Sequence, residues 1–228
     1  LEKGADIKCK DRECRTSLHQ AVENSHLDTC TMLIKRGVDL SAEEAKFGRT
    51  ALHLAAELGL AELADALIVR GCDLYGSGDS IYSKTPLHYA CLNGHHVVAD
   101  VLIKRGIDME ATSGFLDMTA LHCACQKGHL GCVQVLVEAG ADMGALGFTF
   151  NGSTPLHLAS AEGHEQICKY LANKGASLTI QGKFTTAGTA LHVACEFGQT
   201  KVVQHLVNAG ADIEMKDFER KYGHAYSL

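Results

Sequence analysis

Apolar and polar side chains are arranged along this chain in a pattern that repeats every 34 or 35 residues. Each copy holds a short segment that follows a Thr, and then a second, amphipathic segment such as residues 97–103. This spacing of apolar residues predicts two short helices per copy. The copies begin at Thr16, Thr50, Thr85, Thr119, Thr154 and Thr189. A fixed period of this size predicts a solenoid of stacked units.

Helix start and stop signals agree with that pattern. Thr favours the N-cap because its side chain accepts hydrogen bonds from the first turn, and Pro86 and Pro155 stand at the next position, where a missing N–H is harmless. A residue suited to the left-handed conformation then ends each helix. The stops of the first helices are Ser25, Gly59, Gly94, Gly128, Gly163 and Gly198. The stops of the second helices are Gly37, Gly71, Gly106, Gly140, Gly175 and Gly210.

The start of each unit carries a recognisable motif. Thr85-Pro86-Leu87-His88 recurs at position 154, as Thr-Ala-Leu-His at positions 50, 119 and 189, and as Thr-Ser-Leu-His at position 16. The chain resembles the ankyrin-repeat family in this motif. The resemblance implies an all-α ankyrin-repeat solenoid of stacked helix-turn-helix units with β-hairpin-like finger loops. We expect one array over residues 1–228, with six full repeats, partial repeats at both ends, and a larger parent protein.

Only the loops between the helical units vary in length. Each Thr is followed 21 residues later by the Gly that ends the second helix. The interval from such a Gly to the next Thr varies: Gly4 to Thr16 is 12 residues, and the later intervals are 13, 14, 13, 14 and 14 residues. Stacked helices must keep their register, while a loop on the solvent side tolerates insertion. We therefore expect elongated fingers. The Asn that ankyrin repeats commonly carry after the loop Asp is replaced throughout, so the hairpins are expected to depart from the usual geometry.

Aromatic residues gather in these loops, where polar residues are usual. The loop aromatics proposed to contact a protein are Phe47, Tyr82, Phe115, Phe148, Phe150 and Phe184. One interpretation is a row of aromatic anchors for a partner. The other is that each ring packs within its own or the neighbouring finger, as expected for some rings near Ile81-Tyr82 and Phe148-Thr149-Phe150.

A second candidate surface comprises the two residues before each first-helix stop, which face the concave side in ankyrin arrays. The candidates there are Glu57, Leu58, Leu92, Asn93, Gln126, Lys127, Glu162, Glu196 and Phe197. A mildly acidic groove with apolar spots would suit a basic or amphipathic peptide. The alternative is an ordinary solvated face.

Composition narrows the class of protein. The formal charge is −6, and no cluster of Lys and Arg stands out, which argues against nucleic acid as the main partner. No apolar run approaches the roughly 20 residues of a membrane span. Most of the ten Cys lie on the helical pattern, which favours reduced thiols in an intracellular, cytosolic or nuclear, protein over a disulfide framework.

The thirteen His and ten Cys do not predict chemistry. His122, Cys123, Cys125, His129 and Cys132 are the right residue types for zinc, but Cys125 occupies a slot that Ala56 fills elsewhere, and such small buried residues are typical of a core. A stack of short helices also offers no evident catalytic pocket. We expect no enzyme activity, no metal and no cofactor.

The sequence therefore predicts a protein–protein interaction module that binds a protein or peptide through its fingers and concave helices. Two alternatives remain open. The array could be a spacer or spring-like part of a channel or cytoskeletal adaptor, or the substrate-docking domain of an enzyme whose catalytic domain lies elsewhere.

Overall fold

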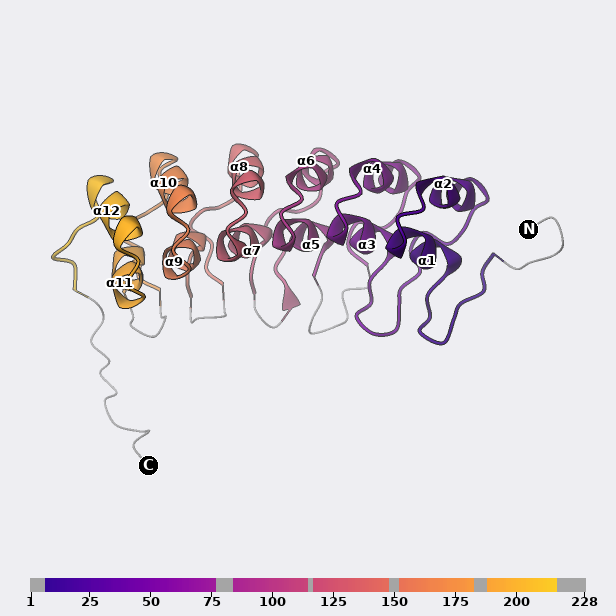
Figure 1. The fold of residues 1–228 in the computed structure, drawn as a ribbon, viewed down its shortest axis with the longest axis horizontal. Coiled ribbons are helices and arrows are strands. Elements are labelled where there is room, and N and C mark those ends of the chain that lie inside the picture. Colours follow the sequence, from indigo (N-terminus) through magenta and orange to yellow (C-terminus); the bar gives the residue numbers. More distant parts are fainter. Residues whose placement is uncertain (1–6, 77–83, 115–116, 148–151, 183–187, 217–228) are drawn as a thin grey trace, which may run out of the picture.

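The helices stand in two rows along an elongated molecule (Figure 1). The computed structural model describes residues 7–76, 84–114, 117–147, 152–182 and 188–216. Within these residues the inner row contains α1 (Ser17–Glu23), α3 (Ala51–Glu57), α5 (Pro86–Leu92), α7 (Ala120–Lys127), α9 (Pro155–Ala161) and α11 (Ala190–Glu196). The outer row contains α2 (Leu27–Lys35), α4 (Ala61–Val69), α6 (His96–Lys104), α8 (Leu130–Glu138), α10 (Glu165–Asn173) and α12 (Thr200–Asn208). The fingers extend from the inner row, on the side away from the outer helices.

Each inner helix starts at the predicted Thr, but the capping contact is reciprocal. The Thr N–H donates to Nδ1 of the His three residues later, over 3.1–3.2 Å in all six units. The Thr hydroxyl lies 2.7–2.9 Å from the same nitrogen. At Thr119 the hydroxyl oxygen also accepts from the N–H of His122, over 3.5 Å. The motif His thus takes the place that Glu or Gln holds in a capping box.

The predicted helix stops adopt the left-handed conformation. Gly128 has φ +79°, and Ser25, the one non-glycine residue in this position, has φ +55°. A side chain is disfavoured in that region of the backbone because its Cβ crowds the following carbonyl. The stops therefore confirm the predicted boundaries of the helical units.

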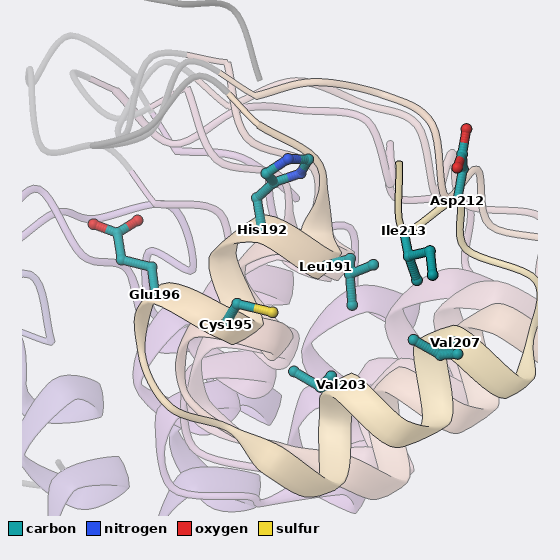
Figure 2. A pocket seen from close by; sticks show the side chains of 8 residues that line it. All are labelled: Leu191, His192, Cys195, Glu196, Val203, Val207, Asp212 and Ile213. Carbon is teal, nitrogen blue, oxygen red and sulfur yellow. The ribbon is translucent and has the colours of Figure 1, made fainter. Parts of the chain in front are cut away.

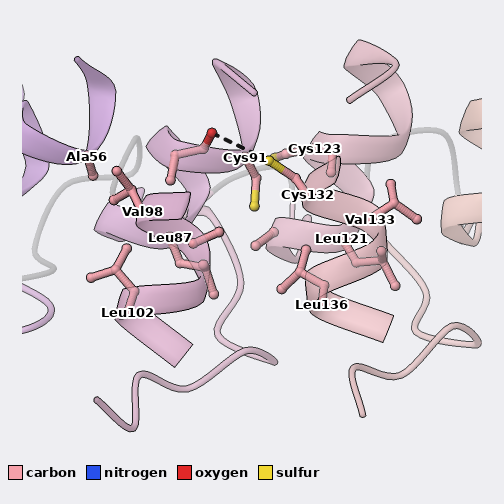
Figure 3. Close-up of a cluster of buried hydrophobic side chains, with 14 of the residues drawn as sticks. Ala56, Leu87, Cys91, Val98, Leu102, Leu121, Cys123, Cys132, Val133 and Leu136 are labelled. Atoms are coloured by element: carbon pink, nitrogen blue, oxygen red, sulfur yellow. Dashed lines mark hydrogen bonds between the residues drawn. The ribbon is translucent and has the colours of Figure 1, made fainter. Parts of the chain in front are cut away.

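The core runs between the rows and continues from unit to unit (Figure 3). The motif Leu of every inner helix is buried, as is a Leu near the end of every outer helix. The Ala two residues after the motif His, such as Ala90 or Ala124, is fully buried where neighbouring inner helices pack together. Its small side chain permits that close approach, so a larger residue there would force the helices apart.

The fingers are paired at their bases, as the hairpin prediction requires. Isolated antiparallel bridges join Lys10 to Thr16, Ser113 to Met118 and Gly147 to Ser153. In the second finger the N–H of Glu44 donates to the carbonyl of Arg49, over 3.1 Å. The predicted strands around Ile81-Tyr82 and Phe148-Thr149-Phe150 lie outside the described residues.

Candidate functional site

The two residues before each inner-helix stop, here called the helix-end pairs, form the candidate concave surface. Leu58 and Phe197 are 42% and 47% exposed, so two large apolar side chains of this surface meet solvent. The other exposed members are Asn24, Asn93, Lys127, Glu162 and Glu196. The half-buried members are Glu23, Glu57, Leu92 and Gln126, and Ala161 is buried. Phe197 directly follows the last residue of α11 and is its C-cap.

An arginine on the second finger reaches back to the concave surface. Nη1 of Arg49 donates to Glu57 over 2.5 Å, and its Nε donates to Glu44 over 2.5 Å. Glu44 is buried, with 6% of its side chain exposed. Burial alone would lower the pKa of the Arg49 guanidinium, but its bonds to these two carboxylates raise that pKa above its ordinary value. The ion pairs of Arg49 with Glu44 and Glu57, here called the Arg49 clamp, therefore fix the second finger against α3.

The first unit repeats this clamp in a more exposed form. Nη1 of Arg15 donates to Glu23 over 3.2 Å, and Nε of Arg15 pairs with Asp11 over 3.0 Å. Each Arg directly precedes the N-cap Thr, and each Glu lies eight residues further on. The acidic members of the helix-end pairs in the first two units, Glu23 and Glu57, are thus paired with arginines. Glu162 of the fifth unit is exposed.

Phe47 is the described member of the predicted finger aromatics. Its ring is 42% exposed and lies 4.8 Å from Nζ of Lys46 and 5.4 Å from Cζ of Arg49. The finger is held to its neighbour because the N–H of Ala45 donates to the carbonyl of Glu13, over 2.9 Å. Phe47 therefore presents an apolar ring between cations at a fixed position.

Tyr75, another loop aromatic, connects two units. Its hydroxyl accepts the N–H of Asp108 over 2.9 Å, and Glu110 accepts the N–H of Asp142 in the same way, over 2.9 Å. Both residues occupy the slot where ankyrin repeats commonly carry Asn. Tyr75 and Glu110, which stand in place of that Asn, therefore still link successive units through their side chains. Sequence reasoning missed this role because Tyr and Glu do not resemble Asn as local turn formers.

The other predicted finger aromatics are not tested by the structure. Tyr82, Phe115, Phe148, Phe150 and Phe184 lie outside the described residues. Their assignment to a binding surface stays a prediction.

The motif His residues join each unit to the next. Nε2 of His88 donates to the carbonyl of Met118 over 2.8 Å, and Nε2 of His122 donates to that of Ser153 over 3.0 Å. His19 and His157 make the same contact over 3.2 and 3.1 Å. Because Nε2 donates and Nδ1 accepts from the Thr N–H, each ring must be neutral.

Burial keeps these rings neutral. It lowers the pKa of His53, His88 and His157 to about 4, although the accepting carbonyls act in the opposite direction. A pKa this low makes these three rings poor acid–base groups at neutral pH, whereas it suits their structural bonds.

A second row of His side chains supports the helix-end pairs, and the sequence interpretation did not identify its role. Nε2 of His95 donates to the carbonyl of Glu57 over 3.0 Å, and Nε2 of His129 donates to that of Leu92 over 3.1 Å. His164 reaches Gln126 over 3.1 Å, and Gln199 replaces His in the last contact, to Ala161 over 2.9 Å. The recurrence of His after the helix-stop Gly was a visible signal, but its partner lies 37 or 38 residues earlier.

Seven of the ten cysteines are buried in the core. Cys91, Cys123 and Cys132 lie among Leu87, Leu121 and Leu136 between the third and fourth units (Figure 3). Burial raises the pKa of the Cys123 thiol to about 12, so a nucleophilic thiolate is disfavoured. Among the described residues, no group of three or more His, Cys, Asp or Glu side chains could hold a metal ion.

The fold, the two His rows and the fingers define an array of ankyrin type. The family model described as "Ankyrin repeats (3 copies)" matches residues 1–77, 40–113, 55–146 and 144–217. The chain therefore belongs to the ankyrin-repeat family. The crystal structure of the human ASB11 ankyrin repeat domain is similar, with a TM-score of 0.77 and 24% sequence identity over 89% of this chain and 87% of that one.

Two curated relatives are similar over part of the array. "NF-kappa-B inhibitor cactus" of Drosophila yakuba is 36% identical over 64 residues, and "Nuclear factor NF-kappa-B p105 subunit" of Gallus gallus is 40% identical over 65 residues. Each match spans 28% of this chain, but only 13% and 7% of the respective relatives. Within the described part of this chain, no helix is long and apolar enough to cross a membrane.

Proposed function

We propose that this array recognises a protein partner through its helix-end pairs and the adjoining fingers. The proposal rests on the exposure of Leu58 and Phe197 on the surface of the helix-end pairs. Hydrogen bonds from the following units hold backbone carbonyls of this surface in place. The carbonyls of Glu57, Leu92 and Gln126 are held by His side chains of the following units. A rigid surface loses little conformational entropy on binding, which favours affinity.

The charges on this surface indicate the chemistry of the partner. Arg15 and Arg49 neutralise the acidic residues of the first two units, while Glu162 on the fifth unit is exposed and carries the acidic character. An amphipathic peptide would place an apolar side chain against Leu58 and a basic one near Glu162. Complementary charges of this kind set orientation and association rate more than affinity.

A paired substitution tests the proposal. In one variant Leu58 and Phe197 are changed to Ser, and in the control the outer-helix residues Val69 and Val97, which are 60% and 54% exposed, are changed to Ser. Both variants remove exposed apolar side chains, so both should keep the melting temperature of the parent. We expect the first variant to lose partners that the parent retains in quantitative affinity capture, and the control to retain them.

The opposite pattern would refute this assignment. Loss of the same partners in the outer-helix control would place recognition on the outer helices instead. Full retention in both variants would remove the helix-end pairs as the binding surface and leave the finger aromatics as the candidate.

We further propose that the module is non-catalytic and works inside the cell. All ten cysteines carry free thiols, and seven of them are buried, which suits a reducing compartment. The two relatives are named for NF-kappa-B, and their local similarity supports a binding role for repeats of this kind.

A further inference from the structure

The first two fingers lie side by side at the N-terminal end of the array (Figure 1). The N–H of Ala45 in the second finger donates to the carbonyl of Glu13 in the first, over 2.9 Å. Arg12 and Lys46, each next to one end of this bond, are exposed and are here called the tip cations. Each stands four residues before the Thr of its unit, so the fold places two cations at equivalent positions of adjacent fingers.

Most carboxylates of these two fingers are already paired with arginines. Arg15 pairs with Asp11 over 3.0 Å and with Glu13 over 3.2 Å. Arg49 pairs with Glu44 over 2.5 Å. Within the described ranges of the chain, neither tip cation forms an ion pair with an acid. The tip cations therefore keep their charge for a ligand.

An exposed ring lies beside the tip cations and leads to the concave surface. Phe47, 42% exposed, lies 4.8 Å from Nζ of Lys46 and 5.4 Å from Cζ of Arg49. Arg49 in turn donates to Glu57, which directly precedes Leu58. The surface of the tip cations thus continues through Phe47 and Arg49 to an exposed member of the helix-end pairs.

The sequence confines the cations to the first two fingers. In the next three fingers, the residues four before the motif Thr are Ile81, Phe115 and Phe150. The whole chain carries a formal charge of −6, so the tip cations oppose the sign of the molecule that bears them. A local field of opposite sign draws an anionic group to one place on the surface.

We propose that the tip cations and Phe47 bind an acidic segment of the partner protein, in which Asp or Glu residues flank an apolar side chain. This inference rests on the proposed function and names the chemistry at one end of the same surface. Carboxylates pair with Arg12 and Lys46, and the apolar side chain packs on Phe47 as an anchor. The bound segment then has a direction, with its acidic part on the first two fingers and its basic part near Glu162.

The hollow at the other end of the array suits a different ligand (Figure 2). A cavity of about 320 Å³ opens between α11 and α12, with apolar walls that include Leu191 and Val203. Glu196 and Asp212 also line it, so an acidic segment would meet like charges there. A preference for acidic ligands therefore distinguishes the first two fingers from this hollow.

Selection from a phage-displayed library of short random peptides tests the proposal. The 228-residue chain should enrich peptides that carry Asp or Glu beside an apolar residue, and an enriched peptide is then titrated by fluorescence anisotropy. We expect its Kd to rise roughly fivefold in Arg12→Gln/Lys46→Gln and roughly tenfold in Phe47→Ser. Higher salt should also weaken binding, because the paired charges are exposed.

A matched control removes two exposed cations from the outer row. Arg36→Gln/Arg70→Gln changes the net charge by the same amount as the tip variant and should leave the Kd unchanged. All these variants alter exposed side chains, so each should keep the melting temperature of the parent. An equal loss of affinity in the control would show that net charge alone attracts the peptide, and would overturn the inference.

Leu58→Ser separates this inference from the proposed function. Enriched peptides that hold no excess of acid but lose binding in Leu58→Ser would overturn the inference and leave the proposed function in place. Acidic peptides that bind Arg12→Gln/Lys46→Gln as tightly as the parent would also overturn it. Failure to enrich any peptide would refute the inference, while affinity capture still decides the proposed function. A single-stranded oligothymidylate that binds more tightly than any peptide, and is lost in Phe47→Ser, would assign the surface to nucleic acid instead.

Discussion

At the scale of single residues, Gly128 serves both the backbone and a neighbouring ring. Its φ of +79° disfavours any side chain, and a Cβ would lie 2.6 Å from Cε1 of His164. Gly140 has a similar conformation, with φ +95°, but no described atom near its Cβ position. The pair therefore separates strain within the backbone from contact with the ring.

We predict that Gly128→Ala lowers the free energy of unfolding by about 2–3 kcal/mol, and that Gly140→Ala lowers it by about 1 kcal/mol. The difference arises because the displaced ring of His164 loses its bond to Gln126, which contributes about 1 kcal/mol. Urea unfolding at pH 7 measures both values. Equal losses would show that the ring moves freely and that the second His row contributes little.

Residue types predicted some contacts and missed others for a physical reason. A His at this position can join neighbouring loops because its two ring nitrogens can donate and accept, and His88 does so. The contact of His164 with Gln126 could not be predicted, because the partner is a backbone carbonyl of another unit. Every residue has a backbone carbonyl, so residue type cannot indicate which carbonyl accepts the bond. Only the stacking of the units shows this partner.

At the scale of elements, the Arg clamps determine how two fingers sit on their inner helices. Nε and Nη2 of Arg49 both bond to the buried Glu44, over 2.5 and 3.2 Å. Arg15 makes the equivalent contacts with acids that are 29–67% exposed. Water can solvate the second set of carboxylates when the Arg is removed, but it reaches Glu44 poorly.

We predict that Arg49→Ala lowers the free energy of unfolding by about 3 kcal/mol, because it leaves a buried carboxylate without its partner. Arg15→Ala should lower it far less, because an exposed ion pair contributes little to stability. Urea unfolding of the two variants at pH 7 and low salt provides the comparison. A loss from Arg15→Ala as large as that from Arg49→Ala would contradict the role of burial.

Helices were predictable here and finger contacts were not. The Thr, Pro and Gly signals act within a few residues, so they indicated where helices such as α5 and α9 begin and end. The bond from Arg49 to Glu57 spans eight residues and forms only because the finger folds back on α3. Charge pairing across that turn depends on the path of the loop, which residue spacing alone does not determine.

At the scale of the whole molecule, the buried His residues of the repeat motif make the stack respond to pH. A ring such as that of His88 must stay neutral to accept the Thr N–H and donate to the next unit. Burial lowers the pKa of His53, His88 and His157 to about 4, below the value of 6.5 expected in the unfolded chain. Between these two values the unfolded chain binds protons that the folded array excludes.

We therefore predict that stability is highest above pH 6.5 and falls as the pH decreases from 6.5 towards 4. The expected loss between pH 7 and pH 5 is on the order of 1–2 kcal/mol per ring, measured as a shift of the urea midpoint. His157→Gln provides the control, because the amide can donate to the carbonyl of Gly188 without titrating, so this variant should show a shallower pH dependence. A midpoint that is the same at pH 7 and pH 5 would mean that these rings accept protons without disturbing the stack, and the neutral bonding pattern would then not hold the units together.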